Sequence, residues 1–480
     1  MTFSTGFLLF FNINRARLNN DAHDIDCLSS KTFNQTTNRS LTNKILIFLI
    51  LVTVMNKIKA AGIAVLEQSV SGLGNAYAGG TAGGEDISTI FYNPAALSEY
   101  AGTEIISGGH LVIPNIRFKT AGSSDLLNRP LTGGSGGKAG NITVIPNLYL
   151  ATDLAGPFRF GLGITVPFGL GAKYNKHWQG RYEAINSQLQ TVDINPAISY
   201  ALNDKVSLGF GFSAQYIDVE LTNALDFGSI CFGQLGTATC SELGLSPQVA
   251  DGKFELKADG WSWGYNAGVL FKPVPNIRFG IAYRSKIDHR VKGDATFRVP
   301  DSAQPLTATG AFINTSAKAE STMPASLSIG AIYEPNQQWA MLLDVTWTQW
   351  NKLDSLTTHF DNPDQPPSTL NLDFKNTIRA ALGLTYHINP AWSIRTGFSY
   401  DESPVRNART RTFRIPDNDR YWLAIGLGYR LNSNFKFNLA YAHVFIKDGR
   451  IDNENRFGHS IEGTIESQID IVSAELQWTF

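Results

Sequence analysis

The chain of 480 residues contains 44 glycines, is 43 % hydrophobic and 11 % aromatic, and has a mean hydropathy of -0.10. Soluble all-β proteins and membrane β-barrels, whose strands alternate apolar and polar faces, both combine such averages with a large core. The formal net charge of -1 argues against a nucleic-acid partner, because a phosphate-binding surface normally needs a clear basic excess.

An apolar run near the N-terminus covers residues 45–55. At about eleven residues it is too short to cross a bilayer as a helix. Arg39 and Lys44 precede it, and the small pair Ala60 and Ala61 follows it. This order of basic, apolar and small residues is typical of a secretory signal peptide.

The predicted signal peptide spans residues 41–60, so the mature chain is expected to begin at Ala61. Residues 1–40 are polar and rich in asparagine, without clear periodicity. They are either a misassigned start upstream of the true one or a long n-region of the signal peptide. The sequence leaves both interpretations open.

A segment without sustained alternation, residues 61–102, is dense in glycine and alanine. The rest of the chain is expected to form a membrane barrel, because its apolar and polar residues alternate. This segment would then join the first barrel strand from the periplasmic side and can fold back into the lumen. Small residues permit close packing without filling a pore. We therefore predict that residues 61–102 form a plug, called the hatch here, and that residues 103–480 form the barrel.

Alternation with period two recurs from residue 104 to the C-terminus, as in strands with one face in lipid and one in water. In the segment 206–216, Leu208, Phe210 and Phe212 alternate with small or polar residues. The segment 421–429 repeats the pattern with a tyrosine at each end. Aromatic residues at both ends of an apolar row are typical of the interfacial girdles of a membrane barrel.

Roughly fourteen such segments follow one another, each long enough for the ~9–11 residues of a membrane-spanning strand. They lie near residues 104–118, 141–153, 158–168, 188–202, 205–221, 261–272, 277–292, 321–334, 339–350, 375–388, 391–402, 420–431, 435–447 and 466–480. The predicted fold is all-β, a 14-stranded antiparallel transmembrane β-barrel with the N-terminal hatch in its lumen.

The connectors between these segments alternate in length. Six are short and rich in turn residues, whereas the others are mostly longer, the largest near residues 222–260 and 293–320. Bacterial barrels have short periplasmic turns and long outer loops. The even strand number puts both termini on the periplasmic side. The last strand carries Trp478 and Phe480 on its apolar face, which looks like the C-terminal signal for the outer-membrane assembly machinery, an expected partner during insertion.

Cysteine and histidine positions limit the chemistry. Cys27 precedes the expected cleavage site, which leaves Cys231 and Cys240 in a stretch rich in Gly, Ser and Thr. In an exported chain this pair predicts one loop disulfide. The eight histidines show no metal-ligand spacing. We expect no metal and no cofactor.

Several short motifs in order resemble the FadL/TodX family of outer-membrane transporters of long-chain fatty acids and aromatic hydrocarbons. They are Glu67-Gln68-Ser69, the run 71–79 (SGLGNAYAG), Asn93-Pro94-Ala95, Pro167-Phe168-Gly169, and the stretches 263–268, 283–285, 403–405 and 415–422. The resemblance implies passive uptake of a hydrophobic small molecule across the outer membrane of a Gram-negative bacterium. It also implies fourteen strands, in agreement with the count above.

For the hatch, the resemblance implies that its tip, Ala61, Gly62 and Ile63, lines an internal ligand pocket. Asn93-Pro94-Ala95 is expected to anchor the hatch to the wall. An ordinary Asn-Pro turn is the alternative for this tripeptide.

Family members carry a kink in the third strand that opens a lateral exit through the wall. The matching position is Gly169, between Pro167 and Gly171. Proline removes a ladder donor and glycine weakens a strand interior, so this segment suits a gate. A plain strand end is the alternative.

Basic and aromatic residues mix in the loop after this strand. They are Lys173, Tyr174, Trp178, Arg181 and Tyr182. We expect an apolar outer groove with a basic rim, which would suit the tail and the head of an amphiphile. Contact with lipopolysaccharide or simple solubility is the alternative.

Four charged residues fall on the faces that alternation assigns to the lumen, namely Arg284, Asp344, Arg379 and Arg395. On the lipid face, a charge near the midplane would cost roughly 2–4 kcal/mol. We expect them to tie the hatch to the wall through ion pairs, with binding of a substrate carboxylate as the alternative.

This chain differs at two positions from the best-known fatty-acid transporters of the family that it resembles. Where those members carry basic residues that can meet a carboxylate, this chain has Asn223 and Thr357. The cargo is therefore left open between fatty acids and neutral hydrocarbons.

The sequence carries no clear motif of an enzyme. It lacks the G-x-S-x-G motif of a hydrolase nucleophile, and its Gly72-Leu73-Gly74 lacks the βαβ setting of a dinucleotide-binding site. We expect a monomeric transporter that is not an enzyme. A general diffusion porin for small hydrophilic solutes and a loop-based adhesin or structural barrel are the alternatives.

Overall fold

The computed structural model describes residues 63–480. The predicted upstream segment, the signal peptide and the tip residues Ala61 and Gly62 lie outside the described residues. In the described part of the chain, every helix is too short or too polar to cross a bilayer.

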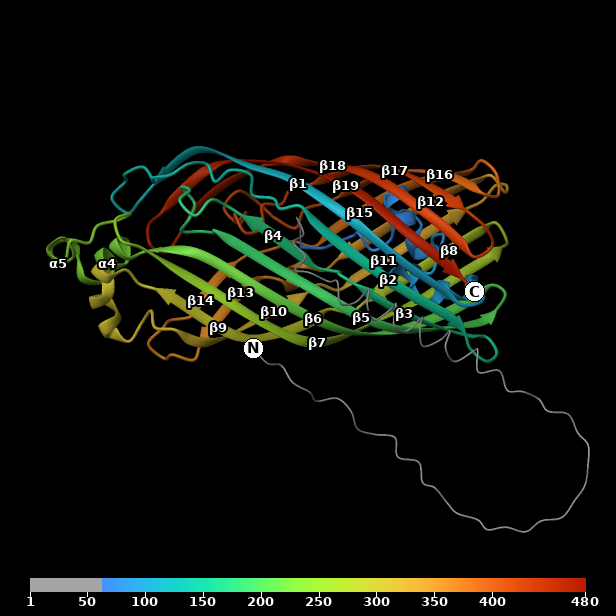
Figure 1. Ribbon diagram of the computed structural model, residues 1–480, viewed down its shortest axis with the longest axis horizontal. Coiled ribbons are helices and arrows are strands. Elements are labelled where there is room, and N and C mark those ends of the chain that lie inside the picture. The colour runs from blue at the N-terminus through green and yellow to red at the C-terminus, as the bar shows by residue number, and fades with distance from the viewer. Residues whose placement is uncertain (1–62) are drawn as a thin grey trace, which may run out of the picture. The chain divides into compact units, whose positions relative to one another are not determined.

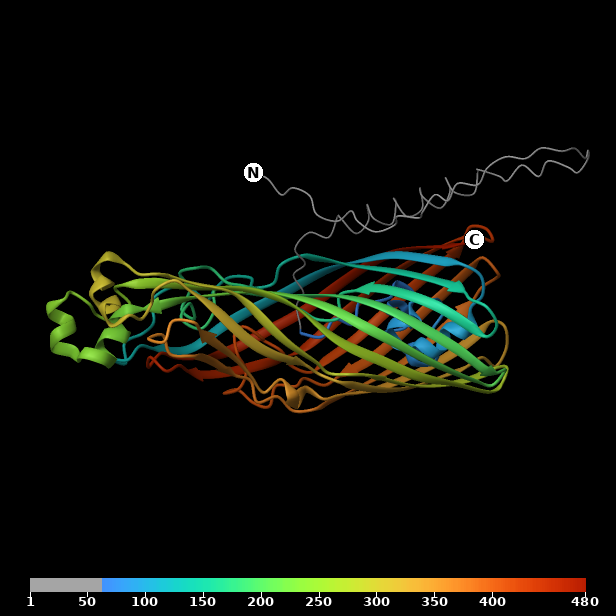
Figure 2. The ribbon, with the colours of Figure 1, turned by 90° about the horizontal axis from the view of Figure 1, so that it is seen from below.

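The described residues form one antiparallel sheet of nineteen strands that closes on itself (Figures 1 and 2). Closure occurs where β1 pairs with β19, from Glu104 opposite Thr479 to Ser124 opposite Ser460. The strands are β1 Glu104–Ser124, β2 Thr143–Asp153, β3 Phe158–Thr165, β4 Gly169–Lys173, β5 Asn186–Asn203, β6 Val206–Asp226, β7 Asp251–Val274, β8 Ile277–Arg284, β9 Ile287–Arg298, β10 Thr315–Met323, β11 Ser326–Tyr333, β12 Trp339–Thr348, β13 Ser355–Phe360, β14 Ser368–Asn371, β15 Thr377–His387, β16 Trp392–Asp401, β17 Arg420–Arg430, β18 Phe435–Glu454 and β19 Ser460–Thr479.

Five pairs of consecutive strands are single wall strands with an interruption. β3 and β4 both pair with β5, and β8 and β9 both pair with β7. In the same way, β10 pairs with β9 and β11 with β8. The last two interrupted strands pair with each other, β12 with β15 and β13 with β14. Counted as interrupted strands, they make a closed 14-stranded antiparallel barrel, which confirms the predicted fold.

The connectors alternate in length around the barrel. Six turns of two to five residues join β2 to β3, β5 to β6, β7 to β8, β11 to β12, β15 to β16 and β17 to β18. The loops at the other end carry α4 Phe227–Leu235, α5 Thr237–Glu242 and η3 Asp301–Thr309, whereas η4 Trp350–Lys352 lies in the interruption between β12 and β13. The disulfide between Cys231 and Cys240 joins α4 to α5.

The outer face of the wall is apolar because alternate side chains point away from the lumen. On β17, Leu423 and Ile425 are 52 % and 55 % exposed, whereas their neighbours Trp422 and Ala424 are buried. In a bilayer the exposed row contacts lipid. Rings pair across strands near the short turns, as at Trp392 and Tyr429, 4.3 Å apart, where an aromatic girdle is most stable.

The hatch lies inside the barrel at the end with the short turns, shown in blue in Figure 1. It contains α2 Val70–Gly74, η1 Gly80–Ala82, α3 Thr89–Tyr92 and η2 Pro94–Glu99. Two side chains cap the first turns of hatch helices. Ser69 accepts a hydrogen bond from Gly72 N at the start of α2, and Asn93 accepts one from Ala95 N at the start of η2. Capping of this kind satisfies the free amides at a helix start.

Glycines on the inner face of the wall let the hatch backbone approach. A Cβ on Gly209 would lie 2.1 Å from the Ala95 nitrogen, and one on Gly397 would lie 2.1 Å from the Asn75 carbonyl carbon. Any side chain at these positions would displace the hatch.

Apolar side chains outside the hatch form three large clusters of buried residues. The first surrounds Phe168, Trp350 and Phe374 and includes the hatch residue Ile63. The second surrounds Trp178 and Phe413, and the third lies in the outer loops around Phe227 and the disulfide. The surroundings of the hatch tip are therefore suited to apolar cargo.

Candidate functional site

The hatch tip occupies an interruption of the wall between β3 and β4. Val65 N donates to Pro167 O at 3.0 Å and Gly169 N donates to Ile63 O at 2.8 Å, so that Ala64 lies opposite Phe168 in a short antiparallel bridge. The predicted tip residue Ile63 and the predicted gate segment are thus in direct contact.

The wall is incompletely paired beside this bridge. Within residues 63–480, β2 pairs with β3 only from Leu148 to Asp153, so residues 143–147 have a partner strand on the β1 side alone. A backbone without a ladder partner is costly in lipid. The hydroxyl of Tyr149, on the same strand, donates to Gln68 O of the hatch at 2.7 Å.

Gln68 holds the tip against the interruption. Its amide nitrogen donates to Val166 O at 2.8 Å, and its amide oxygen accepts from Val166 N at 3.3 Å. The side chain itself is fully buried. Sequence reasoning assigned Gln68 no role, although it lies in one of the motifs that carry the resemblance.

Asn93-Pro94-Ala95 connects the hatch to two wall strands. The Asn93 amide donates to Thr81 O at 2.7 Å and to Val269 O at 3.1 Å. Ser199 donates to Ala95 O at 3.0 Å. The tripeptide therefore begins η2 and also bonds to β5 and β7.

All four predicted lumen charges contact the hatch. Arg395 forms an ion pair with Glu85, with Nε 2.8 Å from the carboxylate. Asp344 accepts from Thr81 N at 2.9 Å, and Arg379 donates to Ala76 O. Arg284 donates to Phe91 O at 2.8 Å. Strands β8, β12, β15 and β16 thus each hold the hatch by one charged side chain.

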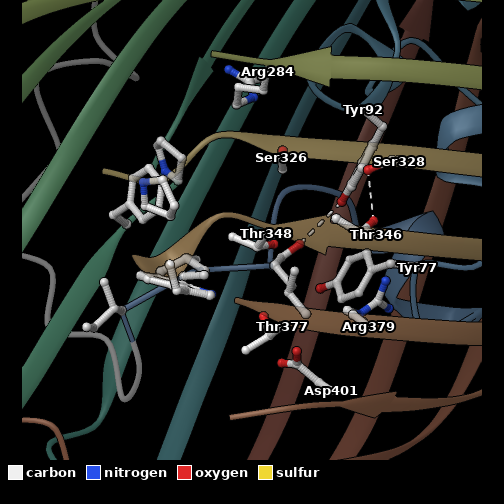
Figure 3. A pocket seen from close by; sticks show the side chains of 18 of the residues that line it. Tyr77, Tyr92, Arg284, Ser326, Ser328, Thr346, Thr348, Thr377, Arg379 and Asp401 are labelled. Atoms are coloured by element: carbon white, nitrogen blue, oxygen red, sulfur yellow. Dashed lines mark hydrogen bonds between the residues drawn. The ribbon is translucent and has the colours of Figure 1, made fainter. Parts of the chain in front are cut away.

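A cavity lies between the tip, the hatch and the wall (Figure 3). Its apolar side includes Ile63, Phe91, Phe168, Trp350 and Ile415. Its polar side is formed by alternate side chains of β11, β12 and β15 and by the two ends of the loop between β16 and β17. The cavity is therefore amphipathic and touches the interruption of the wall.

The residues of the predicted outer groove do not line an open groove. Trp178 and Tyr174 are buried and stack at 4.2 Å between ring centroids, and they pack against Phe413. Arg181 is buried too and donates to Asp251 at 2.7 Å, whereas Lys173 is exposed.

The physical reason is that the aromatic rings bury their area together. The hydroxyl of Tyr174 and the indole N–H of Trp178 each reach a backbone carbonyl, at 2.9 and 2.7 Å. Tyr182 donates to Asp251 at 2.7 Å and stacks on His459. These aromatic residues are therefore buried against one another and their neighbours instead of forming a surface rim.

Two charged residues at the cavity escaped sequence reasoning. Asp401 ends β16 and Arg420 begins β17, and the strand register places them directly opposite each other. The long loop between them hides this relation in the sequence. Only a known register could have revealed it.

Comparisons with known proteins agree with this architecture. A family model described as outer membrane protein transport protein (OMPP1/FadL/TodX) matches residues 51–480. The long-chain fatty acid transport protein of Escherichia coli K12 is 28 % identical over 429 residues, which cover 84 % of this chain and 92 % of the relative. Outer membrane protein P1 of Haemophilus influenzae is 27 % identical over 409 residues, with 80 % and 86 % covered. The crystal structure of a Pseudomonas aeruginosa FadL homologue aligns with a TM-score of 0.81 at 25 % identity, covering 88 % of this chain and 100 % of that one.

Proposed function

Because the chain belongs to the OMPP1/FadL/TodX family of outer membrane transport proteins, we propose that it mediates passive uptake of hydrophobic compounds with lateral release through the wall. The protein is located in the outer membrane of a Gram-negative bacterium. Its Escherichia coli relative is named a long-chain fatty acid transport protein. Long-chain fatty acids and related hydrocarbons are therefore the class of cargo that we propose.

The observation that carries this proposal is the meeting of three features at one place. The cavity, the hatch tip and the interruption between β3 and β4 share Ile63, Ala64, Pro167 and Phe168. A ligand in the cavity is thus separated from the wall interruption by the hatch tip. Lateral release suits apolar cargo, which gains nothing from entering water.

The bonds that hold the tip are few enough to break without an energy source. Two backbone bonds to Pro167 and Gly169 and two bonds of Gln68 to Val166 join the tip to the interruption. The hydroxyls of Tyr92 and Tyr149 also donate to Leu66 O and Gln68 O. At about 0.5–1.5 kcal/mol net for each, these six bonds amount to roughly 3–9 kcal/mol. A displacement of this cost is thermally accessible on the timescale of loop and lid motions.

Two variants test the route. Deletion of residues 61–66 removes the tip, and Gly169→Trp places a bulky side chain at the interruption. We expect both to reduce uptake of a hydrophobic substrate by cells while the barrel stays folded, as judged by its mobility on unheated gels. Gly122→Trp is the matched control, because Gly122 has open space around it. Normal uptake in both test variants would contradict the mechanism.

The rival function is a general diffusion porin. The hatch and the three apolar clusters leave little room for a water-filled path, so we expect low single-channel conductance in planar bilayers. A large, steady conductance of the intact protein would favour the porin instead. Insertion by the assembly machinery, contact with lipopolysaccharide and a monomeric state remain parts of the proposal.

A further inference from the structure

The polar side of the cavity carries more carboxylates than cations. The charged residues that line it are Arg284, Arg379, Arg420, Asp344, Asp401, Glu402 and Asp417. Two of these residues have a partner outside the lining, because Glu402 pairs with Lys375 and Arg284 pairs with Asp193. With these partners included, four cations face five carboxylates, so the formal charge around the cavity is negative. A carboxylate ligand would enter a site that is itself negatively charged. A buried anion is costly unless it is paired with a cation.

Two of the arginines are already paired with carboxylates. Arg420 lies 2.7 Å from Asp417 and 3.6 Å from Asp401. Arg284 lies 3.4 Å from Asp193, whose side chain is completely buried. Both guanidinium groups therefore have their charge compensated by the protein itself.

The third arginine, Arg379, is covered by the hatch. Its side chain donates to Ala76 O, and its Cζ lies 5.7 Å from the ring centroid of Tyr77. Only 7 % of the residue is exposed. In Figure 3 its guanidinium lies beside the Tyr77 ring, while the Tyr77 hydroxyl points away from Arg379, to the side of the cavity on which Thr348 and Thr377 lie.

Two donors of the cavity lining are buried without a hydrogen-bond partner among residues 63–480, the Nε of Arg379 and the hydroxyl of Tyr77. Tyr77 is 2 % exposed, and its oxygen has no hydrogen-bond partner among residues 63–480. By contrast, the hydroxyl of the neighbouring Tyr92 donates to Leu66 O. A buried hydroxyl without a partner is destabilising, and a ligand oxygen in the cavity would satisfy it.

We propose that the cavity binds an uncharged amphiphile, a long hydrocarbon with one hydrogen-bond-accepting oxygen, and that Tyr77 donates to that oxygen. Long-chain ketones, esters and alcohols belong to this class. The tail would lie against the apolar side of the cavity near Phe168. The inference rests on the proposed function, and within the hydrophobic cargo proposed there it selects uncharged compounds over fatty acids at the same site.

The test compares three ligands of equal chain length on the purified full-length protein in detergent. Dodecan-2-one, dodecane and dodecanoate each displace the uncharged fluorescent dye N-phenyl-1-naphthylamine at pH 8. We expect the ketone to bind most tightly and dodecanoate most weakly. Tyr77→Phe should weaken the ketone about tenfold, the scale of one neutral hydrogen bond, and should change dodecane by less than about twofold.

Tyr441→Phe is the matched control, because Tyr441 lies on the outer surface and bonds to Asp470 there. It should leave all three affinities unchanged. Tightest binding of dodecanoate to the unaltered protein would overturn the uncharged class, whatever Tyr77→Phe does. An equal loss for ketone and dodecane in Tyr77→Phe would overturn the role of Tyr77. Both results leave hydrophobic transport standing, whereas the absence of binding by dye and ligands would overturn the proposed function as well.

Discussion

Single charged residues hold the hatch in this barrel, and the pair of Glu85 and Arg395 is the best defined of them. The Arg395 side chain is fully buried, and Glu85 has a second, weaker partner in Lys436 at 3.7 Å. Removing one member of a buried ion pair leaves the other charge uncompensated, which costs more than the pair contributes. The pair therefore enforces one position of the hatch.

This argument predicts the behaviour of two variants. Arg395→Met should lower the free energy of unfolding by about 3–5 kcal/mol and make the hatch accessible to protease. Replacing both residues, with Glu85→Gln added, should recover much of the loss, because no buried charge remains unpaired. Urea unfolding monitored by tryptophan fluorescence measures both. Equal losses in the single and the double variant would show that packing, not charge, is responsible.

Among the elements, the outer ends of the strands depart most from what alternation predicts. The sequence predicts a strand at 261–272, but β7 begins at Asp251. The additional residues carry charged side chains such as Lys257 and Asp259 on the outer face, so the apolar row of a lipid-facing strand is missing there. Hydrogen bonding to β6 extends the strand all the same.

Two interruptions of the wall strands contain a proline. Pro167 lies between β3 and β4, where the sequence suggested a kink, and Pro324 lies between β10 and β11, where the sequence predicted one strand near residues 321–334. The break between β8 and β9 has a different cause, because the Ser285 hydroxyl accepts a hydrogen bond from Tyr265 N in place of the ladder. Nothing local in the sequence indicates that this side-chain hydrogen bond replaces one of the sheet.

Asp226, at the outer end of β6, connects α4 to the loop between β18 and β19. This carboxylate caps α4 by accepting from Gly228 N and Ser229 N, and it bonds to His459 at 2.9 Å. Burial alone would raise the pKa of Asp226, but the hydrogen bonds from His459 and Ser229 outweigh it and lower the pKa below its ordinary value. Since β6 is 21 residues long, this end lies beyond the membrane.

A pH dependence of the outer loop follows. A carboxyl whose pKa is lower in the folded state stabilises that state above its unfolded pKa, and the contribution is lost as the pH falls below about 4. We therefore expect the loop at residues 227–250 to become more mobile below this pH. Hydrogen exchange of its amides measures the effect. In Asp226→Asn the exchange rates should be raised already at neutral pH and respond little to acid.

On the scale of the whole molecule, closure and the lipid-facing surface determine stability. The first and last strands meet along their whole length, so the barrel forms only when contacts across nearly the entire chain are made, and folding of this kind is slow. Once closed, the barrel leaves no strand edge in lipid apart from residues 143–147 of β2 beside the interruption between β3 and β4. Its outer surface must then stay free of charge at the depth of the hydrocarbon.

The lipid-facing surface can be tested with one charge. Ile425→Arg on β17 should lower the free energy of unfolding in phospholipid vesicles by roughly 2–4 kcal/mol. Thr296→Arg on β9 is the control, because Thr296 is exposed on the outer extension of the barrel, and its effect should stay within about 0.5 kcal/mol. Similar losses at both positions would contradict the assignment of the lipid face.

The sequence by itself determined the strand number, the antiparallel arrangement and the sides of the turns and loops, because these depend on a local period of two and on local turn residues. It also separated the hatch segment from the wall and assigned the lumen charges. Only the tertiary structure decided which groups meet. Arg395 and Glu85 are 310 positions apart in the chain, and among residues 63–480 the Tyr77 hydroxyl lacks a partner because of the side chains that surround it. Such contacts between distant segments depend on register and closure, which no local pattern specifies.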